Sequence, residues 1–152
     1  MLKIREVCHG DLDSIKDLLK ELQAFTQIKK DLDSINFDNM LDEMRSLPSM
    51  YSNIIAVEDK KAVGFLSMIC YKNFLHCGGT ALITELIVSN HFRRRGIGKK
   101  LIEKAIEIAE QNGMDELEVG TEKENKIAKT FYRNTGFKTD YLLFGKIFSD
   151  PS

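Results

Sequence analysis

The residues with the clearest chemical potential gather in one short segment of the chain. Residues 93–99 read Arg-Arg-Arg-Gly-Ile-Gly-Lys and lead into a stretch with helical periodicity. A helix start leaves backbone N–H groups without acceptors and carries a partial positive charge, so it suits a phosphate when side chains are out of the way. Gly96 and Gly98 allow close approach, and the arginines and lysines add charge-assisted donors. The segment therefore indicates a pyrophosphate site, with an ordinary capped helix and exposed arginines as the alternative.

Two other phosphate-binding patterns do not fit this segment. The chain has no GxxxxGK[ST] loop, and Leu101 stands where a dinucleotide fingerprint needs its third glycine. Short glycine motifs recur by chance, so the loop alone does not decide between an anion site and a solvated turn.

A single carboxylate stands out upstream of the loop. Glu85 interrupts the otherwise apolar run 82–88. An ionised carboxylate inside a central strand is costly unless it is paired or faces a wet cleft. We therefore expect Glu85 to lie at a cleft.

The elements that must position these residues follow from hydrophobic periodicity and turn residues. Helices are expected over about 12–26, 35–47, 98–111 and 125–133, and extended segments over about 2–7, 53–58, 62–71, 80–88, 117–119 and 137–148. An antiparallel meander is thus followed by one strand-helix-strand crossover. The order predicts a single α+β (mixed α/β) domain over residues 1–152 with a mixed central sheet.

Two motifs in this order resemble the GNAT superfamily of N-acetyltransferases. Arg93, Gly96 and Gly98 fill its pyrophosphate loop [QR]-x-x-G-x-[GA], and residues 85–88 precede that loop at the family's usual spacing. The second signature, N-x-x-A-x-x-x-Y-x-x-x-G-F, is matched by Asn125, Ala128, Tyr132, Gly136 and Phe137. The likeness is close over roughly residues 80–140. Residues 89–92 read Ser-Asn-His-Phe where many members have an Asp-Pro turn, which we interpret as a tolerated variant.

The resemblance implies a fold, a cofactor and a reaction. It implies a mostly antiparallel sheet of six to seven strands flanked by about four helices, and acetyl-CoA as cofactor. The acetyl group would pass directly to a primary amine in a ternary complex. The residues that the resemblance assigns to the cofactor are Leu86, Ile87 and Val88 for the pantetheine arm, Arg93, Arg94, Arg95, Gly96, Ile97, Gly98 and Lys99 for the pyrophosphate, and Asn125.

Two residues are candidates for proton transfer. Glu85, directly or through a water, would take the proton from the incoming ammonium; a paired or acceptor-binding carboxylate is the alternative. By resemblance, the Tyr132 hydroxyl would point at the coenzyme A sulfur and protonate the leaving thiolate; a core tyrosine is the alternative. Capping of its helix accounts for Asn125 almost as well as a cofactor contact does.

Composition restricts the class of protein further. The 43% apolar and 30% charged residues are ordinary for a folded domain, and three cysteines without a CxxC pair favour neither disulfides nor a metal site. We expect a cytoplasmic enzyme without a membrane or nucleic-acid partner. Residues 11–59 hold 11 acidic and 5 basic side chains, which favours a cationic amine acceptor, small molecule or peptide. A homodimer is left open, as is a catalytically silent CoA-binding sensor or interaction domain.

Overall fold

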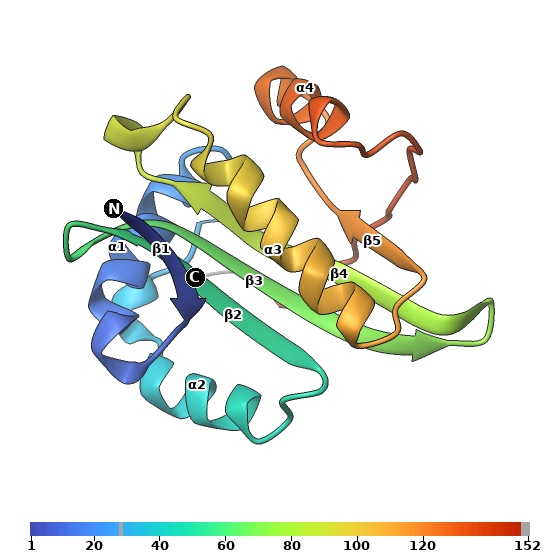
Figure 1. Cartoon of the computed structure of the whole chain (residues 1–152), viewed down its shortest axis with the longest axis horizontal. Coiled ribbons are helices and arrows are strands. Elements are labelled where there is room, and N and C mark those ends of the chain that lie inside the picture. Colours follow the sequence, from blue (N-terminus) through green and yellow to red (C-terminus); the bar gives the residue numbers. More distant parts are fainter. Residues whose placement is uncertain (28, 150–152) are drawn as a thin grey trace.

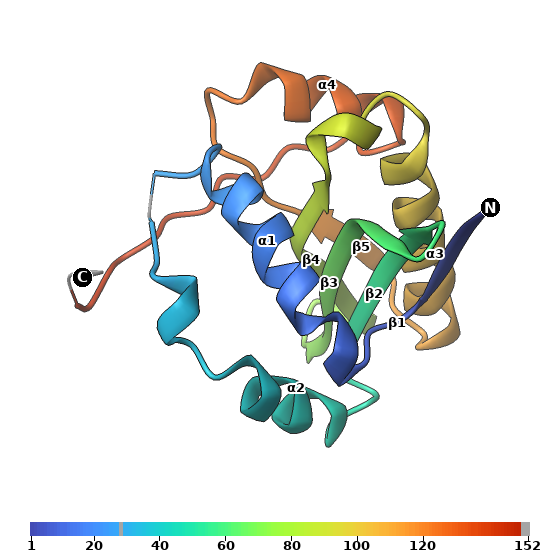
Figure 2. The ribbon, with the colours of Figure 1, turned by 90° about the vertical axis from the view of Figure 1, so that its left-hand side faces the viewer.

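The chain folds around one mixed sheet covered by helices on both faces. The structure is a computed structural model that describes residues 1–27 and 29–149. Seen edge-on in Figure 2, the sheet lies between α3 on one face and α1 and α2 on the other. Its strand order is β1-β2-β3-β4-β5, with every neighbouring pair antiparallel except β4 and β5, which are parallel. The α+β class with a mixed, mostly antiparallel sheet is confirmed.

The elements follow the predicted order closely (Figure 1). The strands are β1 (Leu2–Glu6), β2 (Tyr51–Glu58), β3 (Lys61–Asn73), β4 (His76–Val88) and β5 (Glu116–Val119). The helices are α1 (Leu12–Gln23), α2 (Phe37–Arg45), α3 (Ile97–Gln111) and α4 (Lys126–Asn134), with single 3₁₀ turns at His9–Asp11, Leu32–Ser34 and Asn90–Phe92. In the described part of the chain, none of these helices has the length and apolar character needed to cross a membrane.

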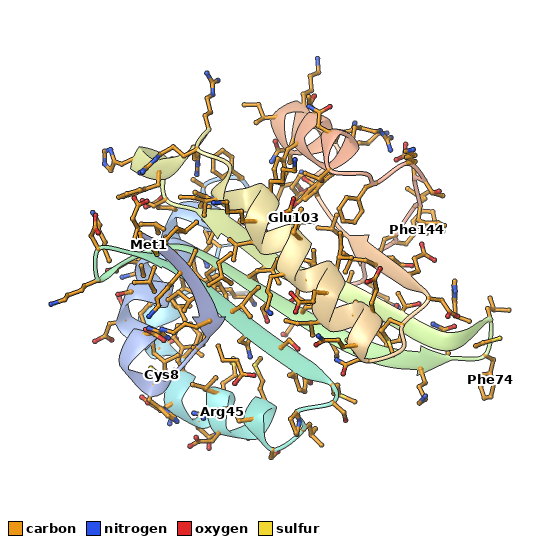
Figure 3. All side chains as sticks on the ribbon, in the orientation of Figure 1. Met1, Cys8, Arg45, Phe74, Glu103 and Phe144 are labelled. Carbon is orange, nitrogen blue, oxygen red and sulfur yellow. The ribbon has the colours of Figure 1, made fainter. Side chains whose placement is uncertain are left out.

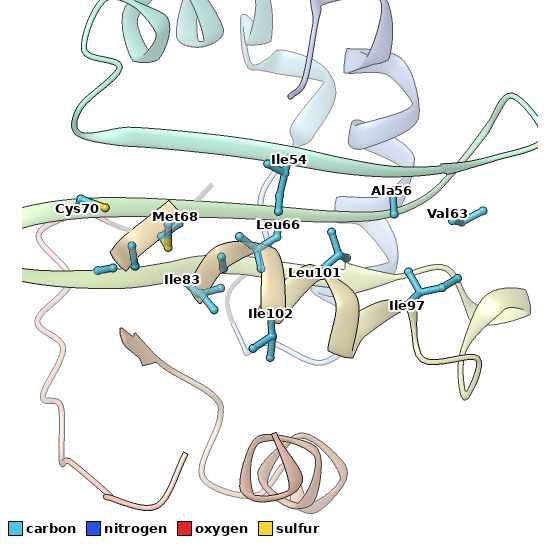
Figure 4. Close-up of a cluster of buried hydrophobic side chains, with 13 residues drawn as sticks. Ile54, Ala56, Val63, Leu66, Met68, Cys70, Ile83, Ile97, Leu101 and Ile102 are labelled. Carbon is cyan, nitrogen blue, oxygen red and sulfur yellow. The ribbon is translucent and has the colours of Figure 1, made fainter. Parts of the chain in front are cut away.

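The larger core lies between α3 and the sheet (Figure 4). The apolar stripe of α3, which includes Leu101, Ile102 and Ala105, packs on alternate residues of the strands such as Ile54, Leu66 and Ile83. Leu101 is fully buried. Burial of such side chains, at roughly 1.5–3 kcal/mol each, holds the start of α3 against the end of β4.

A second core lies on the opposite face. Ile15 and Leu18 of α1 pack there against Ile55, Phe65 and Ile87, which are the residues of β2, β3 and β4 whose side chains alternate to this face. α1 covers only part of the sheet. Residues of this face outside the α1 contact, such as Tyr51, Ile69 and Leu82, are partly exposed.

The sheet is smaller than the resemblance implied. Five strands form in the described residues, instead of six to seven. The predicted extended segment 137–148 joins no ladder: after Phe137, which packs against Tyr132, its residues are exposed and have no strand assignment. β5 pairs with β4 and is the last strand of the sheet, because within the described residues the chain after α4 forms no ladder with its other edge.

Candidate active site

The site begins at the point along β4 beyond which β5 no longer pairs with it. β5 pairs with β4 from Thr80 to Ile83, whereas β4 continues to Val88 and pairs only with β3. Along residues 84–88 every second residue therefore directs its backbone N–H and C=O away from β3. Within the described part of the chain these groups have no strand partner on that side. An extended chain can add to this edge, as the predicted role of Leu86, Ile87 and Val88 requires.

A β-bulge marks the point where the two strands part. Ser67 pairs with Glu85 and the next residue, Met68, pairs with Ile83, so Thr84 is the extra residue. A bulge bends its strand and re-aims the neighbouring side chains. The Thr84 hydroxyl donates to Glu85 Oε2 at 2.5 Å and also lies 3.3 Å from the Ser67 carbonyl oxygen. The bulge thus fixes the direction of the Glu85 side chain close to the point where β4 and β5 part.

Glu85 is half-buried and lies on the α1 face of the sheet, the same face as Ile87. Among the described residues its carboxylate accepts from Thr84 and has no basic partner. Glu85 thus carries a hydrogen bond from Thr84, and both its predicted position at a cleft and its role stay predictions.

The loop after Val88 places the helix start beside the free edge. Asn90–Phe92 form a 3₁₀ turn, Gly96 is the N-cap of α3 with φ +78°, and Arg94 also has a positive φ of 61°. Lys100 N donates the first helical bond, to Gly96 O, at 3.1 Å. The N–H groups of Ile97, Gly98 and Lys99 precede that bond and have no acceptor within the helix. No acidic residue lies in this first turn.

The three arginines of the loop differ in their contacts. Arg93 Nε donates to the Val88 carbonyl oxygen at 3.0 Å, and its guanidinium lies 5.1 Å from the centre of the Phe25 ring. Arg95 pairs with Glu58 at 2.9 Å and stacks over Phe92. Arg94 is exposed and has no partner among the described residues. Two arginines therefore brace the loop, and Arg94 is the one whose charge is open to an anion.

The two glycines also differ. A Cβ on Gly96 would meet nothing within 4 Å, so the position is open as well as left-handed. A Cβ on Gly98 would lie 3.1 Å from Cζ of Phe131 in α4. Gly96 thus leaves free space at the helix start, whereas Gly98 allows α4 to pack against α3. This second role was not expected from the sequence.

The same helix carries Tyr132, the residue after Phe131. Phe131 and Tyr132 contact the same core cluster as Leu86 and Val88, and their rings lie 5.4 Å apart. Burial raises the pKa of Tyr132 to about 12. The phenol is therefore protonated at neutral pH and can donate a hydrogen bond. Its hydroxyl has no hydrogen-bond partner among the described residues, which leaves that donor available.

Asn125 caps α4, as predicted from its type and position. Its Oδ1 accepts from Ala128 N at 3.0 Å, which satisfies one of the first backbone donors of the helix. The side-chain amide nitrogen has no partner among the residues that the structure describes.

An open pocket of about 600 Å³ lies between the residues that follow α1 and those that lead into α4. It is lined by residues 24–27, by Glu122 and by residues 124–127, and Gln27 N donates to Glu122 Oε1 across it at 3.4 Å.

α1 is also held to the loop after β4, because Glu21 accepts from Asn90 N at 3.0 Å. Phe25 and Glu21 are contacts of the loop that the sequence analysis missed, since nothing in their local pattern marks them.

A polar row crosses the α1 face of the sheet, with Ser67 buried at its centre. Asn53 pairs with Ser67 and Ser67 with Glu85, and the Ser67 hydroxyl donates to Asn53 Oδ1 at 2.7 Å. The adjacent row of half-exposed residues joins four strands through Tyr51, Ile69, Leu82 and Glu118. The strands that contain Ser67 and Asn53 were predicted from their apolar residues, and neither polar residue was singled out. Only the register places them beside Glu85.

Comparison with known proteins agrees with this geometry. The model of the acetyltransferase (GNAT) family matches residues 13–137. An aminoalkylphosphonate N-acetyltransferase of Salmonella typhimurium is 28% identical over 149 residues, which are 95% of this chain and 90% of that protein. An uncharacterized N-acetyltransferase of Methanocaldococcus jannaschii is 38% identical over 86 residues, 56% of this chain; the match spans only 38% of that longer relative.

Solved structures share the fold. Glucosamine-6-phosphate N-acetyltransferase from Arabidopsis thaliana has a TM-score of 0.81 at 24% identity, with 98% of this chain and 99% of that chain covered. An aminoglycoside N-acetyltransferase solved in complex with CoA has a TM-score of 0.75 at 21% identity, with 97% and 100% covered.

The fold, the site and the family match together define a class of protein. The chain belongs to the acetyltransferase (GNAT) family. The family and its named N-acetyltransferase relatives support an acetyl-CoA-dependent acetyltransferase.

Proposed function

We propose that this protein transfers the acetyl group of acetyl-CoA directly to a primary amine in a ternary complex. The observation that carries the proposal is the free backbone edge of β4 over residues 84–88, which lies next to the unpaired N–H groups at the start of α3. The free edge of β4 can bind an amide-rich arm as an added strand, and the N–H groups at the start of α3 can bind a pyrophosphate. Acetyl-CoA, when bound there, supplies an activated thioester.

Different groups of the chain would bind different parts of the cofactor. Ile97, Gly98 and Lys99 would donate backbone hydrogen bonds to the pyrophosphate, and Arg94 would add an exposed charge. Arg93 and Arg95 hold the loop through Val88, Phe25, Glu58 and Phe92. One backbone N–H of residues 86–88 would polarise the thioester carbonyl, as preorganised donors do where negative charge develops.

Glu85 is proposed to remove the proton that an amine must lose before it can attack. Glu85 is half-buried close to the point where β4 and β5 part. Among the described residues no basic side chain pairs with its carboxylate. Its carboxylate would accept the proton from the ammonium, directly or through a water, so that the neutral nitrogen can form the new C–N bond.

Tyr132 is proposed to act at the departing sulfur. A phenol with a pKa of about 12 is a far weaker acid than an ordinary thiol with a pKa of about 8.5. Complete proton transfer to the thiolate is therefore uphill. A hydrogen bond from the neutral hydroxyl, which stabilises the developing negative charge, fits the raised pKa better than full donation.

We further propose a cationic acceptor that lies on the open face of the sheet. Glu118 projects to the same face as Glu85, because its neighbours Leu117 and Val119 point into the core beneath α3. Neither carboxylate has a basic partner among the described residues. Their Cα atoms are roughly 8 Å apart by strand geometry, about the separation at which a second amino group of a diamine could reach Glu118 while the first faces Glu85.

A thiol-release assay tests the proposal. Free CoA should appear faster when an amine is added to protein and acetyl-CoA, and a diamine should be a better acceptor than the monoamine of the same length. Calorimetric titration with CoA runs in parallel. Binding without amine-dependent release would favour the silent CoA-binding domain, and absence of binding would overturn the assignment of the site.

A further inference from the structure

The 3₁₀ turn between β4 and the cofactor loop takes no cap from its own sequence. Ser89 is the N-cap residue of the turn Asn90–Phe92, but its side chain makes no capping hydrogen bond. The first backbone N–H groups of a helical turn have no acceptor within the turn, and a nearby side-chain oxygen normally satisfies one of them. The Asn90 N–H at the start of this turn therefore depends on an acceptor from another part of the chain.

Glu21, in the last turn of α1, supplies that acceptor. Its Oε2 accepts from Asn90 N at 3.0 Å, although 69 residues separate the two in the chain. Its Oε1 lies 3.5 Å from the hydroxyl oxygen of Ser89, which is buried. Both carboxylate oxygens thus face the start of the turn, where the oxygen of a local capping side chain would otherwise lie. A hydrogen bond to a carboxylate is also stronger than one between neutral groups.

The end of α1 contacts the loop at a second position. The Arg93 guanidinium lies 5.1 Å from the centre of the Phe25 ring, four residues after Glu21. Residues four apart lie on the same side of a helix, so Glu21 and Phe25 face the loop together. Of these two contacts, the one from Glu21 is made to the backbone of the turn. It therefore acts directly on the path of the main chain.

The remaining contacts of this segment come from the sheet. Ser89 N donates to the Val63 carbonyl oxygen at 2.9 Å, and Arg93 Nε donates to that of Val88. The β3–β4 hairpin is remote from the segment, because it lies at the other end of β4, where Figure 3 shows Phe74 at its tip. The loop is thus held by α1 on one side and by the end of the sheet on the other.

The loop itself is not in a relaxed conformation. Arg94 has a φ of 61° and Gly96 has a φ of 78°. A positive φ is unfavourable for an arginine and persists where the surrounding contacts hold the chain. Loss of a contact just before Arg94 would therefore let the loop change shape. The N–H groups at the start of α3 would then no longer converge on one anion.

We propose that Glu21 is a positioning residue for the cofactor: by capping the turn Asn90–Phe92 from α1, it holds residues 93–99 in the shape that binds a pyrophosphate. The inference rests on the proposed function, because it concerns the same loop. Glu21 acts through the main chain and does not touch the cofactor. A loop that is held in its binding shape before CoA arrives binds more tightly, because the apparent affinity is proportional to the fraction of molecules in the competent shape.

The alternative, that Glu21 acts through its charge, does not fit its surroundings. A carboxylate close to an anion-binding loop repels a pyrophosphate and so weakens binding. Asn90 and Ser89 are its hydrogen-bond partners, and within the described part of the chain no basic side chain pairs with it. A cap depends on an acceptor oxygen, and the charge only adds to it. A glutamine at this position should therefore retain most of the function.

A double-mutant cycle between Glu21 and Asn90 tests the proposal. Asn90→Pro removes the N–H from which Glu21 accepts, and a proline suits the first position of a helical turn. Ser89, with φ −53° and ψ 140°, already has the conformation that precedes a proline. In calorimetric titration with CoA, Glu21→Ala should weaken binding roughly 10-fold in the wild-type background and less than about 2-fold in the Asn90→Pro background.

Two further variants separate the hydrogen bond from the charge. Glu21→Gln keeps an acceptor oxygen and should bind CoA within about 3-fold of the wild type. Asp17→Ala, one turn earlier on α1, removes an exposed carboxylate that has no hydrogen-bond or ion-pair partner among the described residues, and should bind like the wild type. Equal losses for Glu21→Ala in both backgrounds, or the same loss in Glu21→Gln as in Glu21→Ala, would overturn the capping role.

Steady-state kinetics distinguish positioning from a general loss of structure. Glu21→Ala should raise KM for acetyl-CoA roughly 10-fold and leave kcat within about 2-fold, because saturating cofactor restores the competent loop. A lowered kcat with an unchanged KM would contradict the proposal. Circular dichroism of each variant shows whether it is folded.

Amide exchange separates this inference from the proposed function. Without CoA, the Asn90 amide should exchange roughly 10-fold more slowly in the wild type than in Glu21→Ala, and equal rates would refute the cap. A wild type that does not bind CoA would overturn the proposed function and with it the role toward CoA, while the exchange rates still decide the cap. Equal CoA affinity of the wild type and Glu21→Ala would overturn the positioning role alone.

Discussion

Arg93 is hydrogen-bonded to the end of the strand that precedes it: its Nε donates to the Val88 carbonyl oxygen at 3.0 Å. The same guanidinium lies over the ring of Phe25, which follows α1. One side chain of the loop thus contacts both the end of β4 and the segment after α1. Its neighbour Arg94 makes no such contact within the described residues. The first arginine of the motif therefore shapes the loop, and the second carries the open charge.

Alanine variants should separate these two roles. Arg94→Ala should weaken CoA binding about 5-fold at low salt and little at high salt, because an exposed charge is screened. Arg93→Ala should weaken it roughly 10-fold at both salt concentrations and lower the melting temperature, because it removes a charged hydrogen bond and a cation–π contact. Calorimetry at 50 and 500 mM salt makes the measurement. The same salt dependence in both variants would contradict this division.

Glu85→Gln keeps the size of the side chain and the hydrogen bond from Thr84, but removes the base. We expect kcat/KM to fall about 100-fold at neutral pH, with loss of the acidic limb of the pH–rate profile. Glu118→Gln, on the same face, is the matched control and should keep that limb while raising KM for a diamine. An unchanged profile in Glu85→Gln would remove this residue as the base.

Tyr132→Phe should lower kcat roughly 10- to 100-fold and change the affinity for CoA less than about 3-fold. Because the phenol has a pKa of about 12, it stays protonated between pH 6 and 9, and the wild-type profile should show no limb from this group. Steady-state kinetics across that range provide the measurement. Full turnover by the variant would refute a role at the sulfur.

Gly78→Ala should destabilise the fold by about 3 kcal/mol. A Cβ at Gly78 would lie 1.8 Å from the Gly113 carbonyl oxygen, a backbone atom that cannot give way, next to the start of β5. Gly120→Ala is the control, since a Cβ there meets nothing within 4 Å and φ is not positive. Urea unfolding compares the two. Equal stability of both variants would show that the approach of β4 to this turn is not tight.

His9 should make stability depend on pH. Its Nδ1 lies 2.8 Å from Asp38 and its Nε2 lies 2.8 Å from Asp42, both on α2. The hydrogen bond to Asp38, followed by that to Asp42, raises the pKa of His9. The folded state thus binds the proton more tightly than the unfolded state. The stabilisation is complete below the unfolded pKa of about 6.5 and is lost as pH rises through the raised folded value.

Thermal melts of His9→Asn and the wild type should therefore differ more at pH 5.5 than at pH 9. His91→Asn, in the exposed loop, should follow the wild type at both values. A difference for His9→Asn that is independent of pH would show that the ring contributes without its charge.

The amino-acid sequence by itself determined the order of the elements as far as α4, and the motif that indicated the family. Helical periodicity placed α1, α3 and α4 within a few residues, and Asn125 was correctly assigned as a cap, because these signals are local and repeat within one or two turns. The spacing of Arg93, Gly96 and Gly98, together with the second signature from Asn125 to Phe137, indicated the family. The catalytic roles of Glu85 and Tyr132 remain predictions.

Only the tertiary structure decided what depends on contacts between distant segments. The parting of β4 from β5, the bulge at Thr84 and the row from Asn53 through Ser67 to Glu85 are set by strand register. The packing of Phe131 on Gly98 and of Phe25 on Arg93 joins residues far apart in the chain. Residues 137–148 show the limit most clearly: their apolar character suggested a strand, but a strand needs a partner, and local sequence cannot say whether one is within reach.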